Sequence, residues 1–163
     1  MEGMTAAKRK TSESIDDYLK AIFKLAGAED RRVGSKELAD HLVIAPASVT
    51  NMLQRLSSSP TRFVEYQRHR GVKLSKLGRK RALEIVRHHR LIETFLFKVL
   101  DYAIEELHDE AERLEHFISE HFEERIDRKL GHPNCDPHGH CIPAFDGTMP
   151  AQHLVSCRCG HID

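Results

Sequence analysis

The chain has 163 residues, with 25 basic and 25 acidic side chains that cancel to a formal net charge of zero. Its apolar content of 40% is enough to build one domain or two small ones. No stretch approaches the roughly 18 uninterrupted apolar residues of a membrane span, and the polar start lacks the apolar segment of a secretory signal. We therefore expect a soluble, cytoplasmic protein with no membrane partner.

The zero net charge hides an uneven division along the chain. Residues 1–90 carry 19 Lys and Arg against 10 Asp and Glu, a surplus of nine positive charges. Residues 91–163 carry 6 against 15, a surplus of nine negative charges. A basic half suits a polyanion such as nucleic acid, whereas an acidic half suits cations or a protein interface.

The basic half starts with a predicted disordered arm, residues 1–10, and continues with helical patterns. Apolar residues recur at helical spacing over 11–27. A second helix is expected to begin with Ser35 as its N-cap, and a third covers 46–56, with a proline suited to its first turn. Two helices joined by a tight turn predict a helix-turn-helix, although short amphipathic helix pairs also occur in other folds.

The third helix has two different faces. Val49, Leu53 and Leu56 face inward, which leaves small or polar residues outward. The second helix of a helix-turn-helix enters the major groove, where short side chains allow close approach and Asn or Gln pairs with adenine. We predict DNA contacts from this helix and from the start of the one before it: Ser35, Pro46, Ala47, Ser48, Thr50, Asn51 and Arg55.

Residues 63–74 predict a β-hairpin with a basic tip. Residues 63–66 alternate as a strand, a turn follows, and 72–74 alternate back. In a winged helix-turn-helix such a tip lies against the phosphate backbone, where arginines add affinity without reading sequence. We predict phosphate contacts from Arg68 and Arg70, the alternative being a solvated loop.

The second half is expected to be helical. A long helix covers about 75–97, with His89 and Glu93 four residues apart and hence on one face, and a last helix covers about 123–130. The leucine and phenylalanine residues of this half give more apolar surface than one small bundle hides. A homodimer interface accounts for the excess.

The acidic stretch 105–121 is the strongest candidate for a functional site. On a helix, Glu112, Glu115 and His116 occupy positions i, i+3 and i+4 and share one face. Two carboxylates and an imidazole placed together favour a divalent metal ion. The alternative is a solvated acidic helix with incidental histidines.

From Gly131 the composition shifts to glycine, proline, histidine and cysteine, which is typical of an ordered loop or a linker. All four cysteines fall in the last 29 residues. The spacing of Cys157, Cys159 and His161 fits no usual zinc pattern. We expect the tail, residues 147–163, to be flexible.

In combination, these segments resemble the diphtheria toxin repressor family of metal-dependent transcriptional regulators, in its manganese transport regulator branch, over about residues 11–146. The matching stretches come from the first helix, the recognition helix, the wing and the later helices: Ser14–Leu19, Ile22–Phe23, Pro46–Thr50, Val64–Tyr66, Arg70–Leu74, Gly78–Arg79, His89–Leu96, His108–Glu110, Leu114–His116, Pro137–Gly139 and Ile142–Pro143.

The resemblance implies two metal sites and possible further ligands. The regulatory ligands would be Asp17, Glu112, Glu115 and His116, the ancillary ligands His89, Glu93 and His108, and the further ligands Asp136 and His138. The iron-responsive branch has Met and Cys where Asp17 and Glu112 stand here. Hard carboxylate oxygen in place of soft sulfur favours Mn²⁺, with Fe²⁺ close behind.

The resemblance also implies a fold and a function. The fold is mainly α with a small β-wing: a winged helix-turn-helix over 11–75, then an all-helical dimerisation and metal-binding domain over 76–146, without the SH3-like domain of many relatives. The function is a homodimeric, metal-activated repressor of metal-uptake genes, in which metal bridges the two domains. It would bind a palindromic double-stranded DNA operator and no small organic substrate.

Two other functions remain open from the residues alone. A carboxylate-bridged di-metal enzyme in a helical bundle needs paired Glu-x-x-His elements, and Glu105-x-x-His108 has no clear second copy. Such an enzyme would also leave the basic half unexplained. A winged-helix regulator that responds to no metal would use the acidic half for dimerisation alone.

Overall fold

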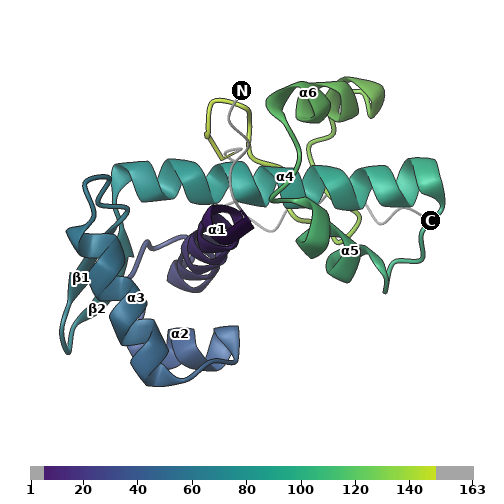
Figure 1. Ribbon diagram of the computed structural model, residues 1–163. Helices are drawn as coiled ribbons and strands as arrows, with labels where there is room; N and C mark the ends of the chain where they lie inside the picture. Colours follow the sequence, from purple (N-terminus) through teal and green to yellow (C-terminus); the bar gives the residue numbers. More distant parts are fainter. Residues whose placement is uncertain (1–5, 150–163) are drawn as a thin grey trace. The chain divides into compact units, whose positions relative to one another are not determined.

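A computed structural model describes residues 6–149 of the chain (Figure 1). The chain divides into two compact units, one up to Leu83 and one from Glu84 onward. The division falls inside α4, a 25-residue helix that runs from Lys76 to Leu100. Each unit therefore takes part of this helix.

The first unit is a three-helix core with a two-stranded hairpin, visible beside α3 in Figure 1. This architecture confirms the predicted winged helix-turn-helix. Its apolar core includes Leu19, Leu38, Leu53 and Val72, all buried, from the helices and the second strand. The elements before α4 are α1 (Ala6–Ala26), α2 (Ser35–Leu42), α3 (Pro46–Ser58), β1 (Val64–Gln67) and β2 (Gly71–Leu74).

Two helix starts differ from the expectation. α1 begins at Ala6, inside the stretch predicted as an arm, because alanine and lysine are good helix formers and extend the helix upstream. Ser35 is the first residue of α2 and not its cap. The cap position is Gly34, whose N–H donates to Glu37 Oε2 at 3.4 Å. The side chain of Glu37 thus does the capping that the serine hydroxyl was expected to do.

The wing is joined to the segment before α2. Strands β1 and β2 pair antiparallel, and Val33 and Val72 exchange two backbone hydrogen bonds of 2.9 Å. Gly71 has a φ of +87°, and a Cβ there would lie 2.4 Å from the Val33 carbonyl oxygen. Only glycine fits this close backbone approach at that conformation.

The turn between α2 and α3 contains a strained residue. Val43 ends α2 with φ 55° and ψ 45°, in the left-handed region, and the residue is 88% exposed. A β-branched residue is disfavoured there because its Cβ crowds the following carbonyl. Asparagine tolerates the same conformation.

We therefore expect Val43→Asn to raise the free energy of unfolding by about 1 kcal/mol. The measurement is urea denaturation followed by circular dichroism. Ile44→Asn is the matched control, since Ile44 is the exposed neighbour outside the left-handed region. Equal effects of the two substitutions would show that side-chain polarity, and not backbone strain, decides the result.

The second unit corrects one sequence expectation, because the acidic stretch 105–121 is not a single helix. α5 (Leu107–Leu114) ends in a turn, and Ser119 caps a new helix, α6 (Glu120–Lys129), by accepting a hydrogen bond from the Phe122 N–H at 3.2 Å. A serine cap satisfies an open backbone donor and so favours a helix start. Glu115, just after α5, keeps helical angles of φ −56° and ψ −27°.

Two small apolar clusters hold the second unit together. Ile92 and Leu96 of α4 pack against Leu107 and Ala111 of α5. Leu91, the neighbour of Ile92 on α4, packs instead against α6 and the following segment through Ile126 and Ile142. Because adjacent residues on a helix point about 100° apart, α4 offers one face to each cluster.

The irregular segment 131–149 is an ordered loop anchored by arginines of α4. Arg87 Nη1 donates to the Pro143 carbonyl at 2.7 Å, and Arg90 Nη1 donates to the Cys141 carbonyl. Within the segment, the Ile142 N–H donates to the Asn134 carbonyl at 2.8 Å. The composition of this segment predicted either an ordered loop or a linker, and the structure shows an ordered loop. Residues 150–163, and with them Cys157, Cys159 and His161, lie outside the described residues.

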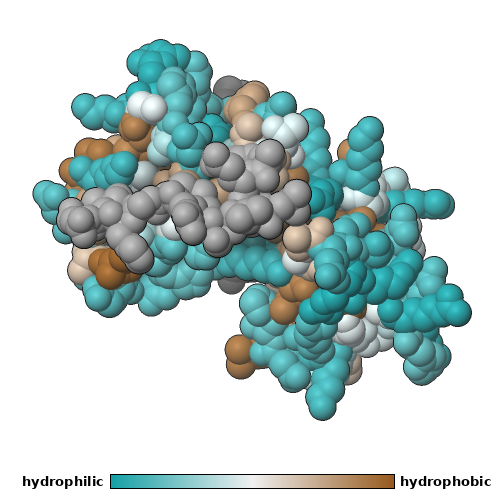
Figure 2. Space-filling view, turned by 180° about the vertical axis from the view of Figure 1, so that it is seen from behind, coloured by the Kyte–Doolittle hydropathy of each residue, from teal (hydrophilic) through white to brown (hydrophobic). Residues whose placement is uncertain are grey.

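The surface of the second unit carries large apolar side chains. Figure 2 shows hydrophobic residues in separate spots on a mainly hydrophilic surface. Phe117 is 60% exposed. Apolar exposure of this kind suits a dimer interface. The other large apolar residues that are exposed in this unit are Val99, Leu100, Ile104, Leu114, Phe122 and Phe145.

Among the described residues, none of the helices is both long and apolar enough to span a membrane.

Candidate metal centre and DNA-binding surface

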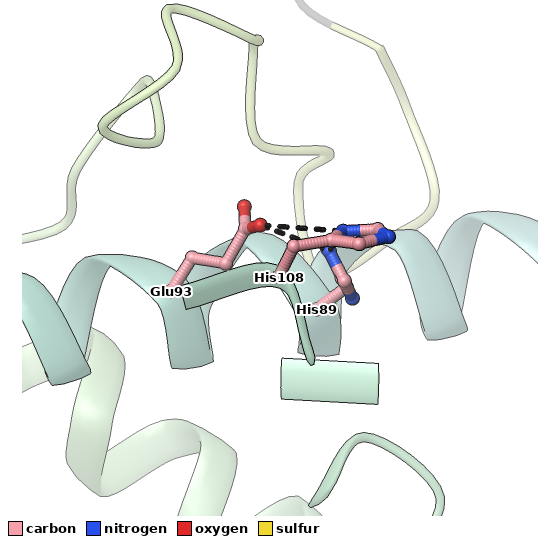
Figure 3. Close-up of side chains that lie close together, drawn as sticks. All are labelled: His89, Glu93 and His108. Atoms are coloured by element: carbon pink, nitrogen blue, oxygen red, sulfur yellow. Dashed lines mark hydrogen bonds and ion pairs between the residues drawn. The ribbon is translucent and has the colours of Figure 1, made fainter. Parts of the chain in front are cut away.

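His89 lies at the centre of the candidate metal centre. It and Glu93 are one turn apart on α4, and its Nε2 lies 3.0 Å from Glu93 Oε1 and 3.2 Å from His108 Nδ1 of α5. Figure 3 shows the Glu93 carboxylate directed at the two imidazoles. One ligand atom from each of the three residues lies within 4.8 Å of the others. The predicted ancillary ligands are thus neighbours, although α4 and α5 are separate helices.

The other ring nitrogen of His89 contacts Glu115, which belongs to a second group of possible ligands. Its Nδ1 lies 2.6 Å from Glu115 Oε2, and Glu115 is 0% exposed. Glu115 Oε1 lies 3.5 Å from His116 Nε2, and Glu112 Oε1 lies 3.7 Å from His108 Nε2. Within this unit the residues predicted for the regulatory and ancillary sites therefore form one continuous cluster.

The charge around His89 fits a cation. Burial, the largest influence, would lower the pKa of His89, but its hydrogen bonds with Glu115 and Glu93 outweigh burial and raise the pKa above the ordinary histidine value. The carboxylates thus favour positive charge at this position. Imidazole nitrogen with carboxylate oxygen, in a group without thiol, is a donor set that suits Mn²⁺ or Fe²⁺. The residues present fit such an ion.

Glu93 also belongs to a third group. Its Oε2 lies 3.5 Å from His138 Nδ1, and ligand atoms of Glu93, Asp136 and His138 lie within 4.8 Å of one another. Asp136 Oδ1 accepts the backbone N–H of His138 and of His140, at 2.9 and 2.8 Å. Burial would raise the pKa of Asp136, but the hydrogen bonds from His140 outweigh it and lower the pKa. Asp136 therefore also shapes the loop that carries His138.

Sequence spacing did not reveal the contact of His89 with Glu115. The two residues are 26 positions apart and come from different elements, so no helical period links them. Asp17 lies on α1 in the first unit, directly after Asp16. Its role as a ligand rests on the family resemblance.

The predicted DNA-binding residues lie at the start of α2, on the open face of α3 and on the wing. Val49 and Leu53 are buried on the opposite face of the helix. The Thr50 hydroxyl donates to the Pro46 carbonyl at 3.1 Å, so it is turned toward its own helix. Ser35 and Thr50 are half-buried, whereas the others are exposed: Pro46, Ala47, Ser48, Asn51, Arg55, Arg68 and Arg70.

Comparison with known proteins matches both halves of the chain. The iron dependent repressor N-terminal DNA binding domain matches residues 10–72, and the iron dependent repressor metal binding and dimerisation domain matches residues 75–144. The HTH-type transcriptional regulator MntR of Bacillus pumilus is 31% identical over 116 residues, which is 71% of this chain and 78% of the relative. The iron-dependent repressor IdeR of Mycobacterium bovis is 32% identical over 135 residues, which is 82% of this chain and 56% of the relative.

A solved structure is also similar. A manganese-dependent transcriptional repressor in complex with manganese has 40% sequence identity and a TM-score of 0.76, with 84% of this chain and 62% of that chain covered. The chain thus spans less than two thirds of the length of that repressor. With both domain descriptions matched along most of its length, the chain belongs to the iron-dependent repressor family, whose members are transcriptional regulators and not enzymes.

Proposed function

We propose that this chain is a metal-activated, DNA-binding transcriptional repressor with Mn²⁺ or Fe²⁺ as its corepressor. The observation that carries the proposal is the cluster around His89, where imidazoles and buried carboxylates converge in a domain of the metal-binding type. The exposed polar face of α3 and the basic wing support the DNA-binding part of the function. The names of the relatives, which are manganese- and iron-dependent repressors, agree with both metal binding and DNA binding.

The ligand assignment is part of the proposal. The regulatory ion would be held by Asp17, Glu112, Glu115 and His116, and an ancillary ion by His89, Glu93 and His108. Asp136 and His138 would add ligands beside Glu93. The short distances within the second unit support the assignments there, and the family resemblance supports Asp17.

The proposed activation is a clamp between the two domains. Asp17 belongs to the DNA-binding half, and the other regulatory ligands belong to the dimerisation half. Clustered carboxylates repel one another, and a bound divalent ion supplies the opposite charge that makes their approach favourable. Asp17 would then hold the recognition helices of a homodimer at a spacing that fits half-sites about one DNA turn apart, in a palindromic operator.

The remaining parts of the proposal concern DNA and its biological use. Asn51 and the small residues of α3 would contact base edges, and Arg68 and Arg70 would contact phosphates. Ser35, Pro46, Ala47, Ser48, Thr50 and Arg55 complete the proposed DNA-contact set. The regulated genes would be those of metal uptake and homeostasis, and the protein would act in the cytoplasm.

The experiment is fluorescence anisotropy on duplexes selected from a random DNA pool. Binding is measured at fixed salt after chelation, then with added Mn²⁺, Fe²⁺ under anaerobic conditions, or Zn²⁺. We expect tight binding only with metal. A differential metal affinity of a few kcal/mol is enough to shift most of the protein to the active state.

Two variants separate the metal step from the DNA step. Glu115→Gln should lose metal-dependent activation, whereas Asn51→Ala should keep metal binding by calorimetry and weaken DNA binding. Equal DNA binding by the wild type with and without metal would contradict the proposal and favour a winged-helix regulator that responds to no metal.

A further inference from the structure

The neighbouring residues Asp16 and Asp17 of α1 have different surroundings. The Asp16 side chain is only 4% exposed, and both of its oxygens accept hydrogen bonds from one arginine of α4. Arg81 Nε donates to Oδ1 at 2.8 Å, and Arg81 Nη2 donates to Oδ2 at 2.8 Å. This two-pronged pairing is strongly directional, because the planar guanidinium matches the carboxylate in both position and orientation.

A second arginine of α4 holds the same helix. The Arg79 guanidinium lies 5.4 Å from the centre of the Phe23 ring and 3.6 Å from Asp30. Phe23 is seven residues after Asp16, which is about two helical turns, so both arginines contact the same side of α1. Two contacts separated along one face fix the rotation of a helix about its axis.

The rotation of α1 matters because of the next residue. Consecutive side chains on a helix point about 100° apart, so the setting of Asp16 determines the direction of Asp17. Arg81 belongs to α4, whose later turns carry His89 and Glu93. Asp16, Asp17 and Arg81 all belong to the first unit, so the pair sets the position of a proposed metal ligand within that unit.

We propose that Asp16 and Arg81 are positioning residues for the metal response: their two-pronged pair sets the direction of Asp17 and so sets the metal concentration at which DNA binding begins. The inference rests on the proposed role of Asp17 as a ligand. The two adjacent aspartates would then have different roles. Asp16 pairs with Arg81, and Asp17 binds the metal ion.

The test is the Mn²⁺ concentration that gives half-maximal DNA binding, measured by anisotropy with a selected duplex in metal-buffered solution. Asp16→Asn and Arg81→Gln should raise this midpoint about tenfold, since coupling of this size is typical of allosteric systems. The DNA affinity at saturating Mn²⁺ should stay within about twofold of wild type, because the ligand itself remains. Arg81→Lys should give an intermediate midpoint, because an ammonium keeps the charge without the two-pronged geometry.

Val33→Ala is the matched control for a general loss of stability, since Val33 is buried in the apolar core of the same unit and is not a member of the pair. It should lower the melting temperature and leave the Mn²⁺ midpoint unchanged. Unchanged midpoints in Asp16→Asn and Arg81→Gln, with lower melting temperatures, would overturn the inference and leave a purely structural ion pair. If these two variants do not fold, Arg81→Lys provides the test: an Mn²⁺ midpoint above that of the wild type supports the inference, and an unchanged midpoint overturns it. A wild type that ignores Mn²⁺ would instead overturn the proposed function, and the positioning role with it.

Discussion

Asp17→Ala is expected to abolish metal-activated DNA binding, with an affinity loss on the order of 100-fold at saturating Mn²⁺. The alanine variant lacks the only regulatory ligand that we assign to the DNA-binding half, so bound metal no longer couples that half to the dimer. The dimer itself should persist, because the dimerisation domain is untouched. Anisotropy measures the first effect, and analytical ultracentrifugation measures the second.

Glu13→Ala is the matched control for this prediction. Glu13 is a carboxylate on the same helix, one turn before Asp17, and its removal changes the charge of α1 by the same amount. We expect its metal response to equal that of the wild type. Metal-stimulated binding retained by Asp17→Ala would refute the clamp between the domains while leaving the DNA-binding surface in place.

Arg87→Met is expected to lower the free energy of unfolding by about 3–5 kcal/mol, because it leaves buried acceptors without their cation. Arg87 is 8% exposed. It donates through Nε to Glu123 and through Nη1 to the Pro143 carbonyl, and its Nη2 lies 3.3 Å from Asp127. Urea denaturation measures the loss.

Arg128→Met is the control, since Arg128 pairs with Glu124 on the open surface of α6 and exposed pairs contribute about 0.5 kcal/mol or less. The double variant Arg87→Met with Glu123→Leu should recover part of the lost stability, because no unpaired buried carboxylate remains. Equal losses for Arg87→Met and Arg128→Met would contradict the importance of the buried network.

The same network gives the stability a pH dependence with a definite sign. Burial would raise the pKa of Glu123, but hydrogen bonds from His88 and Arg87 outweigh it and lower the pKa below the ordinary glutamate value. This stabilisation is present above the unfolded-state pKa and is lost as the pH falls through the folded-state pKa. In Arg87→Met, which lacks one of the two donors, the loss should begin at a higher pH.

The fold was predictable where local patterns decide it. Buried positions three or four residues apart, such as Val49, Leu53 and Leu56, placed the recognition helix with its buried face correctly assigned. The failures came where one local interaction outweighed the pattern. The cap at Ser119 split the acidic stretch into two helices, and Glu37 took over the capping of α2 from Ser35.

The sequence allowed us to predict which residues belong to the candidate site, but not which residues of different helices contact one another. Pairs within one helix, such as His89 with Glu93, follow from the helical period. The contact of His89 with Glu115 depends on how α4 packs against the turn after α5, and the pair of Asp16 with Arg81 spans 65 positions. Packing of this kind leaves no periodic mark in the sequence. The ligand role of Asp17 stays a prediction.

The anchored loop 131–149 also limits how the chain can vary in length. The carbonyls of Cys141 and Pro143 receive guanidinium groups from Arg90 and Arg87, which are three residues apart on a rigid helix. Adding or removing a residue just before Cys141 would shift both carbonyls out of register with these donors. The length of the loop is therefore fixed. Insertions or deletions in it should be far less tolerated than substitutions at its exposed positions.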